Sequence, residues 1–294
     1  NSYVLKIDDK EITKTEVTKI LQNEENPETR RKAHESKIAC GDLIAEDLVE
    51  FIKMRNEYAK TKGYENYFEY KLKEDYEVEN EFLEKLINEV YSKTQNTIKE
   101  IQTKKQSDLK KFFNVDELKA YHYGLLLSDN PEKGVNEVLE KNDITLISKN
   151  MYKKMGYDVD KMIADGRLTL DLFPRKDKNT HGFCFGVEAG KDSRILANLT
   201  NNVVSLDTLN HEMGHCVYDL GIDTKLPFLD RTAASPAVTE AVAMMMGDVI
   251  KRENVLAEYL DKDLLEKFKK SVKEDEASFI SKSLLIIDFE REFY

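Results

Sequence analysis

Two histidines and a glutamate are the residues best suited to chemistry in this chain. His211, Glu212 and His215 form the pattern H-E-x-x-H within the stretch SLDTLNHEMGHCVYDLG. Residues four apart on a helix have Cβ atoms about 5–6 Å apart, so two imidazoles at this spacing can bind one metal ion. Glu212 then lies beside the ion without having to bind it. The pattern therefore predicts a metal site in which Glu212 acts on a water molecule.

A helix from Ser205 to Gly221 is expected to carry these side chains, because Ser205 suits an N-cap and Gly221 suits the residue that ends a helix. Apolar residues recur at three- and four-residue steps on the side away from the histidines. They are Leu206, Leu209, Met213, Val217 and Leu220. This apolar stripe should be buried, and the histidines should face a cavity.

A third ligand is needed from another part of the chain, because a catalytic zinc ion usually has three protein ligands and one open position. No histidine follows His215, so we expect a carboxylate. Asp219 lies two turns from His211, too far along the helix axis to share the ion. Glu240 is the preferred candidate, and Asp230 is the alternative.

A second helix is expected to position Glu240. Ser235 suits its N-cap, and Pro236 suits its first residue. Three small residues would let this helix approach the first one closely: Ala237, Ala241 and Ala243.

The composition excludes some classes of partner. The 294 residues include 45 Lys and Arg against 56 Asp and Glu, a net charge of −11, which argues against binding nucleic acid. No run approaches 18 apolar residues, so no membrane span is predicted. The first residues, NSYVLKIDDK, have no signal-peptide core, which favours a cytoplasmic location.

The three cysteines, Cys40, Cys184 and Cys216, are too few and too scattered to indicate a disulfide framework. Each is expected to be a small buried residue. Cys216 follows His215 directly and should therefore point away from the metal.

The remaining pattern predicts a mainly α fold of long helices, with a small antiparallel sheet beside the cleft. The chain is helical in pattern from about Thr13 to Lys111. Two sets of apolar residues are expected to form buried helix faces: Leu43, Ile44, Leu48, Phe51, Ile52 and Met54, then Phe82, Leu83, Leu86, Ile87, Val90 and Tyr91. We expect one catalytic-domain fragment over residues 1–294, with a helical part at 1–150 and a zinc-site part at 151–294.

Strands are expected at Thr180–Val187 and Ser193–Thr200, joined by a tight turn at AGKD, and a short hairpin is expected over residues 2–12. Ile195, Ala197 and Leu199 should share a buried face. An edge strand beside a cleft can hold an extended peptide through main-chain hydrogen bonds.

These motifs resemble known peptidases. HEMGH followed by LPFLDRTAASPAVTEAVAMMMGD resembles the peptidyl-dipeptidase A family, typified by angiotensin-converting enzyme, and the oligoendopeptidase F and thimet oligopeptidase families are similar. The resemblance implies a gluzincin, a zinc metallopeptidase that hydrolyses peptide bonds of short peptides. One Zn²⁺ ion would be bound by His211, His215 and Glu240, with Glu212 as the catalytic residue.

The same resemblance implies roles for neighbouring residues. His181 matches a substrate-contacting histidine, and the main chain at Gly182 and Cys184 matches substrate-pairing positions, although a packed or solvated His181 stays an alternative. The families usually have an aspartate four residues after the ligand glutamate, where this chain has Met244. Three aspartates are candidates to orient the histidines instead: Asp207, Asp219 and Asp248.

The families also have a tyrosine and a histidine downstream that stabilise the oxyanion, and no histidine follows Glu240 here. We therefore expect a fragment of a longer enzyme. Two other classes stay open: a catalytically silent metal-binding helical scaffold or peptide-binding module, and a helical interaction protein without metal.

Overall fold

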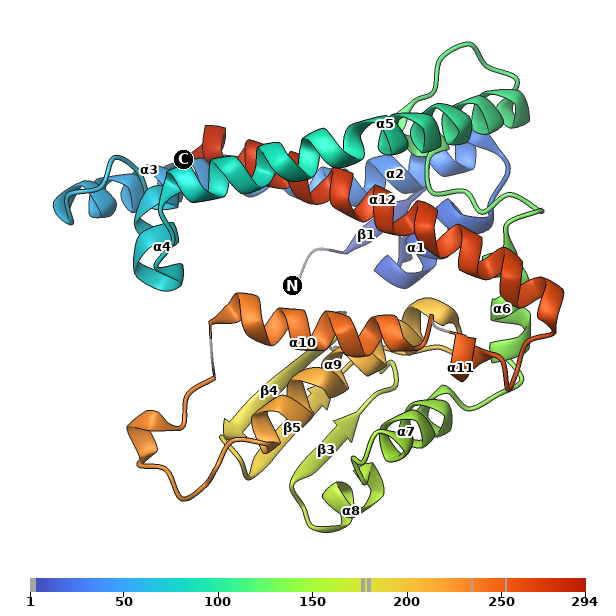
Figure 1. Cartoon of the computed structure of the whole chain (residues 1–294). Helices are drawn as coiled ribbons and strands as arrows, with labels where there is room; N and C mark the ends of the chain where they lie inside the picture. Colours follow the sequence, from blue (N-terminus) through green and yellow to red (C-terminus); the bar gives the residue numbers. More distant parts are fainter. Residues whose placement is uncertain (1–3, 176–177, 179–180, 234, 252) are drawn as a thin grey trace. The chain divides into compact units, whose positions relative to one another are not determined.

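The computed structural model describes residues 4–175, 178, 181–233, 235–251 and 253–294. Most of these residues are helical, and the strands are few and short (Figure 1), so the mainly α prediction is confirmed. The chain divides into two compact units. One contains the residues up to Leu127 together with Lys273–Tyr294, and the other is Ser128–Val272. No helix within the described ranges has an apolar stretch of the length that a bilayer requires.

The first unit begins with the predicted hairpin, whose residues 2 and 3 lie outside the described part of the chain. Strands β1 (Leu5–Ile7) and β2 (Lys10–Ile12) pair antiparallel. Asp8 and Asp9 between them have φ angles of 48° and 62°, as a tight two-residue hairpin turn requires. The helices are α1 (Lys14–Asn23), α2 (Pro27–Asp42), α3 (Ala45–Thr61), α4 (Tyr67–Tyr76), α5 (Asn80–Phe113), the short η1 (Ala120–His122) and the end of α12 (Lys262–Phe293).

The guanidinium of Arg30, in α2, binds the main chain of two other segments. Arg30 is fully buried. Its Nη1 donates to the carbonyls of Leu21 at 2.9 Å and Glu24 at 2.8 Å. Its Nε donates to the carbonyl of Tyr121 at 2.8 Å, and its Nη2 to that of Tyr123 at 2.9 Å. One planar cation therefore joins the end of α1 to η1.

Two helix faces that the sequence analysis expected to be buried are largely exposed. In the first set only Ile52 is buried, while Leu43, Ile44, Leu48, Phe51 and Met54 are exposed. In the second set Phe82, Leu86 and Tyr91 are exposed, and Leu83, Ile87 and Val90 are half-buried. Amphipathic spacing identifies a face that can be buried, but it does not identify the element that covers it.

The second unit contains a sheet and shorter helices (Figure 1). Its helices are α6 (Pro131–Leu139), α7 (Ile144–Lys154), α8 (Val159–Ala164), α9 (Val203–Leu220), η2 (Phe228–Asp230), α10 (Pro236–Val249), α11 (Glu253–Leu256) and the start of α12. Its strands are β3 (Leu168–Asp171), β4 (Phe183–Glu188) and β5 (Asp192–Leu196). The apolar stripe of α9 lies in its hydrophobic core.

The sheet has the strand order β3-β5-β4. Strands β4 and β5 pair antiparallel, as predicted, with Cys184 opposite Ile195. Strand β3, which the sequence analysis did not predict, adds to β5 in parallel, so the sheet is mixed. The predicted residue Thr180 lies outside the described part of the chain. Ile195, Ala197 and Leu199 are buried, as expected. Strand β4 is largely exposed and forms one edge of the sheet.

Replacing Arg30 with Leu should lower the free energy of unfolding by about 3 kcal/mol or more, because several carbonyl oxygens lose their donor and each buried unsatisfied group costs about 1–3 kcal/mol. Urea unfolding followed by circular dichroism measures the change. Arg31→Leu is the matched control, since Arg31 makes exposed ion pairs with Glu28 and Glu35. Equal losses in the two variants would contradict the assigned role of Arg30.

Candidate metal centre

Helix α9, which carries both histidines, begins earlier than the sequence analysis predicted. Asn202, not Ser205, is its N-cap, and the Oδ1 atom of Asn202 accepts a hydrogen bond from the N–H of Ser205 at 2.7 Å. The Ser205 hydroxyl instead accepts from the N–H of Thr200 at 3.1 Å. Asn and Ser are about equally good N-caps, so propensity does not separate the two positions. The helix ends at Leu220 with Gly221 as its cap, as predicted.

The apolar stripe of α9 anchors the helix. Its five residues are exposed by at most 6%, which confirms the predicted burial. They are Leu206, Leu209, Met213, Val217 and Leu220.

A polar network that the sequence analysis missed fixes α9 one residue before His211. Asn210 is fully buried. The Tyr152 hydroxyl donates to the carbonyl of Asn210 at 2.6 Å, and the Ser148 hydroxyl donates to its Oδ1 atom at 2.8 Å. Both partners lie on α7. The sequence did offer one signal for this network, because Asn210 follows Leu209 of the apolar stripe and a buried amide needs hydrogen-bond partners.

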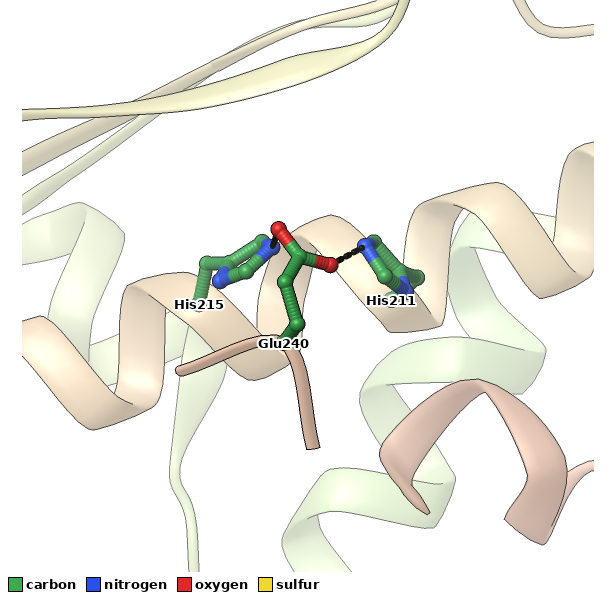
Figure 2. Close-up of side chains that lie close together, drawn as sticks. All are labelled: His211, His215 and Glu240. Atoms are coloured by element: carbon green, nitrogen blue, oxygen red, sulfur yellow. Dashed lines mark ion pairs between the residues drawn. The ribbon is translucent and has the colours of Figure 1, made fainter. Parts of the chain in front are cut away.

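The two histidines and Glu240 converge, as predicted from the sequence (Figure 2). The Nε2 atom of His211 lies 3.4 Å from Oε2 of Glu240, and the Nε2 atom of His215 lies 3.4 Å from Oε1. One ligand atom from each residue lies within 4.8 Å of the other two. The alternative ligand, Asp230, is not part of this cluster among the described residues.

These distances suit a shared ion better than direct hydrogen bonds. Ligands that bind a tetrahedral zinc ion at about 2.0–2.1 Å are roughly 3.3–3.4 Å from one another. The separations of 3.4 Å between the histidine nitrogens and the Glu240 oxygens match that edge. A charged hydrogen bond would be shorter, at about 2.7–2.9 Å. Two imidazoles and one carboxylate are also the ligand set of a known class of catalytic zinc site.

Glu212 lies beside the cluster in a different environment. It is 8% exposed, whereas the Glu240 side chain is 55% exposed. Burial raises the pKa of Glu212, partly opposed by the charge of His215 and by a hydrogen bond from the N–H of Cys184. Glu240 is thus an exposed carboxylate that faces both rings, and Glu212 is a buried carboxylate next to them.

Helix α10 positions Glu240 by crossing α9 at very close range. Ser235 precedes the helix and Pro236 is its first residue, as predicted. A Cβ atom added to Gly214 would lie 2.9 Å from the Cα of Ala243, so a larger residue would push the helices apart. Ala243 is fully buried at this crossing, as expected. The other two alanines, Ala237 and Ala241, are exposed and do not form the contact.

The three aspartates considered for orienting the histidines lie in different surroundings. Asp207 forms an ion pair with Lys251 at 3.4 Å. Asp219 accepts a hydrogen bond from the Ser193 hydroxyl, and burial raises its pKa. Asp248 is half-buried near the end of α10. Their orienting role stays a prediction.

A cavity of about 400 Å³ opens at the cluster. Gly182 and Cys184 line it together with both histidines, Glu212 and Glu240. The cavity therefore borders β4 on one side and the candidate ligands on the other. His181 is exposed just before β4 and is not among the residues that line the cavity.

Residues 20–294 match peptidase family M3, and the chain belongs to this family. The peptidases of this family are metallopeptidases. No curated protein sequence matches the chain at a significant level.

Solved structures share the fold. One described as an oligoendopeptidase F from Bacillus anthracis aligns with 100% of this chain at 20% identity and a TM-score of 0.75. PZ peptidase A, solved with an inhibitor, aligns with 99% at 17% identity and a TM-score of 0.65. A peptidase from Chlamydophila abortus aligns with 96% at 15% identity and a TM-score of 0.59. The aligned parts are 53%, 51% and 46% of those chains, so this chain spans about half their length.

These comparisons support the resemblance to oligoendopeptidase F that the motifs carry. They do not confirm the resemblance to the peptidyl-dipeptidase A family.

Replacing Gly214 with Ala should reduce stability by about 1–3 kcal/mol, the usual cost of overpacking, because the new methyl group meets the backbone of α10. Thermal unfolding of the purified variant measures this. Gly41→Ala in α2 is the matched control, since its added Cβ meets nothing within 4 Å. A Gly214→Ala protein as stable as the control would show that the crossing is not tight.

Replacing Glu212 with Gln should stabilise the metal-free protein at neutral pH. Burial raises the pKa of Glu212 in the folded state, so the folded protein binds more protons than the unfolded chain between the two pKa values. Wild-type stability therefore falls as pH rises through that window, and the variant lacks this fall. Thermal unfolding in EDTA, from about pH 4 to about pH 8, compares the two proteins. Parallel curves at all pH values would contradict the assignment.

Proposed function

We propose that this chain contains the zinc site of a metallopeptidase that hydrolyses peptide bonds of short peptides. The observation that carries the proposal is the convergence of His211, His215 and Glu240 beside the buried Glu212, in a chain of peptidase family M3. All four residues lie in the second unit, Ser128–Val272. The structural neighbours named as oligoendopeptidases favour the oligopeptidase type over the peptidyl-dipeptidase type.

One Zn²⁺ ion is the proposed cofactor, held by the Nε2 atoms of His211 and His215 and by the carboxylate of Glu240. When bound, it would polarise the substrate carbonyl and lower the pKa of a bound water molecule to about 7. The exposure of Glu240 supports the assignment, because an open site has room for water and substrate beside the protein ligands.

Glu212 is the proposed general base. Its carboxylate takes a proton from the attacking water and returns it to the amine that leaves the broken peptide bond. A raised pKa suits both steps, because a group that titrates closer to the working pH can accept and then donate a proton. The N–H of Cys184 holds the carboxylate beside the cavity while the proton is exchanged.

Strand β4 is the proposed docking edge for the peptide. It pairs only with β5 among the described strands and borders the cavity. An extended peptide can add to such an edge through main-chain hydrogen bonds, which bind peptides largely independently of their side chains. We assign this pairing to the main chain at Gly182 and Cys184, and we place His181 at the start of the same edge.

Two variants separate the roles of the glutamates. Glu212→Gln should retain one zinc ion per chain and lose activity by about 10²–10⁴-fold, because the base is removed and the ligands stay. Glu240→Ala should weaken zinc binding by at least about 100-fold. Zinc content by elemental analysis and cleavage of a fluorogenic peptide by the full-length protein, with and without chelator, measure both effects.

Asp230→Asn is the matched control and should retain both zinc and activity. Undiminished turnover of Glu212→Gln would refute the mechanism. Loss of zinc from Asp230→Asn with its retention in Glu240→Ala would refute the ligand assignment. A full-length protein that binds zinc without hydrolysing peptides would instead support the catalytically silent binding module.

A further inference from the structure

Two cysteines lie in contact between the sheet and α9, the helix that carries both histidines. The thiols of these cysteines have no role in the proposed mechanism. Cys184 is on β4 and Cys216 is on α9, and 32 positions separate them in the sequence. Their Sγ atoms are 2.7 Å apart. The fold therefore pairs two cysteines that the sequence analysis treated as isolated small residues.

The two thiols differ in their access to solvent. Cys216 is fully buried and belongs to the hydrophobic core. Cys184 is half-buried and lines the cavity that contains the candidate ligands. A small solute in the cavity can therefore reach Cys184, whereas Cys216 has no exposed surface and is not among the residues that line the cavity.

We propose that Cys184 and Cys216 form a redox modification site, in which oxidation by a small peroxide joins the two thiols in a disulfide between β4 and α9. The separation of 2.7 Å between the sulfur atoms exceeds the length of a disulfide bond by less than about 1 Å. Closing the bond therefore requires little movement of either element.

The reaction takes place in two steps that balance. The sulfur of Cys184 attacks one oxygen of hydrogen peroxide, the O–O bond breaks, and a sulfenic acid and one water molecule form. The sulfur of Cys216 then attacks the sulfenic sulfur, the S–O bond breaks, and the hydroxyl leaves as water with the proton of Cys216. The two thiols lose two electrons and two protons, and the peroxide is reduced to two water molecules.

The structure assigns this order to the cysteines because only Cys184 faces the cavity. Cys216 is fully buried and lies against Cys184, so it is placed to react with the sulfenic acid once that forms. If the two cysteines acted only as small apolar residues, peroxide treatment would leave them unlinked.

The disulfide has a consequence for hydrolysis that depends on the proposed function. The main chain at Cys184 is a proposed peptide-pairing position, and its N–H binds Glu212. Linking β4 covalently to α9 at this residue restricts adjustment of the strand to a bound peptide and should therefore lower the rate of peptide cleavage, and reduction should restore it. The covalent link itself is measured independently of activity, so the site is tested even if the chain hydrolyses nothing.

Mild hydrogen peroxide treatment of the full-length protein, followed by alkylation without reduction and peptide mapping, tests the site. We expect a linked pair of peptides that contain Cys184 and Cys216, with Cys40 as the single alkylated cysteine. Dithiothreitol should restore alkylation at all three positions. This test uses the wild-type protein, so its outcome does not depend on whether a variant folds.

Cys40→Ser is the matched control and should form the same link, because Cys40 lies in α2 of the other unit. Cys184→Ser and Cys216→Ser should each abolish it. The proposal is overturned if all three thiols stay free after peroxide treatment. It is also overturned if Cys184 is oxidised to a sulfinic acid without a link to Cys216, or if the link that forms includes Cys40.

Discussion

The candidate metal centre depends on how closely two helices cross. Two of its side chains come from α9 and the third from α10, so the distance between the helices sets the distance between the ligands. Gly214 makes this crossing possible, because a Cβ atom at that position would lie 2.9 Å from the Cα of Ala243. The glycine within HEMGH has no chemistry of its own. It nonetheless supports the cluster, since it lets α10 approach α9 closely enough for Glu240 to face both rings.

The same region combines an advantage for chemistry with a cost in stability. Glu212 is buried next to two histidines, and its ionised form is disfavoured there. Burial therefore makes the Glu212 carboxylate more basic than one in water, and it lowers the stability of the folded protein where that carboxylate is ionised. The apolar stripe of α9 offsets this cost, because its buried leucines, methionine and valine anchor the helix on the opposite side. Separate faces of one helix therefore carry the buried apolar stripe and the two histidines of the candidate metal centre.

The closeness of the candidate ligands was more predictable than the contacts that support them. The spacing of His211 and His215, and the helix start before Glu240, follow from local rules, so the closeness of these three residues could be predicted from the sequence. The partners of Asn210 lie about 60 positions away in the sequence. Strand β3 pairs with β5 although β4 lies between them in the sequence. Neither contact follows from a local pattern. Helix periodicity likewise misjudged the faces around Phe51 and Phe82, because it does not show what packs on them.

The network around Asn210 uses a hydroxyl, an amide and a carbonyl, and it contains no group that ionises near neutral pH. Burial raises the pKa of Tyr152, so its phenol stays neutral even in alkaline solution. Helix α9 is therefore held in place next to His211 by hydrogen bonds between neutral groups. The backbone that carries the two imidazoles is therefore ordered by the fold itself, so binding at this site needs little reordering of the helix.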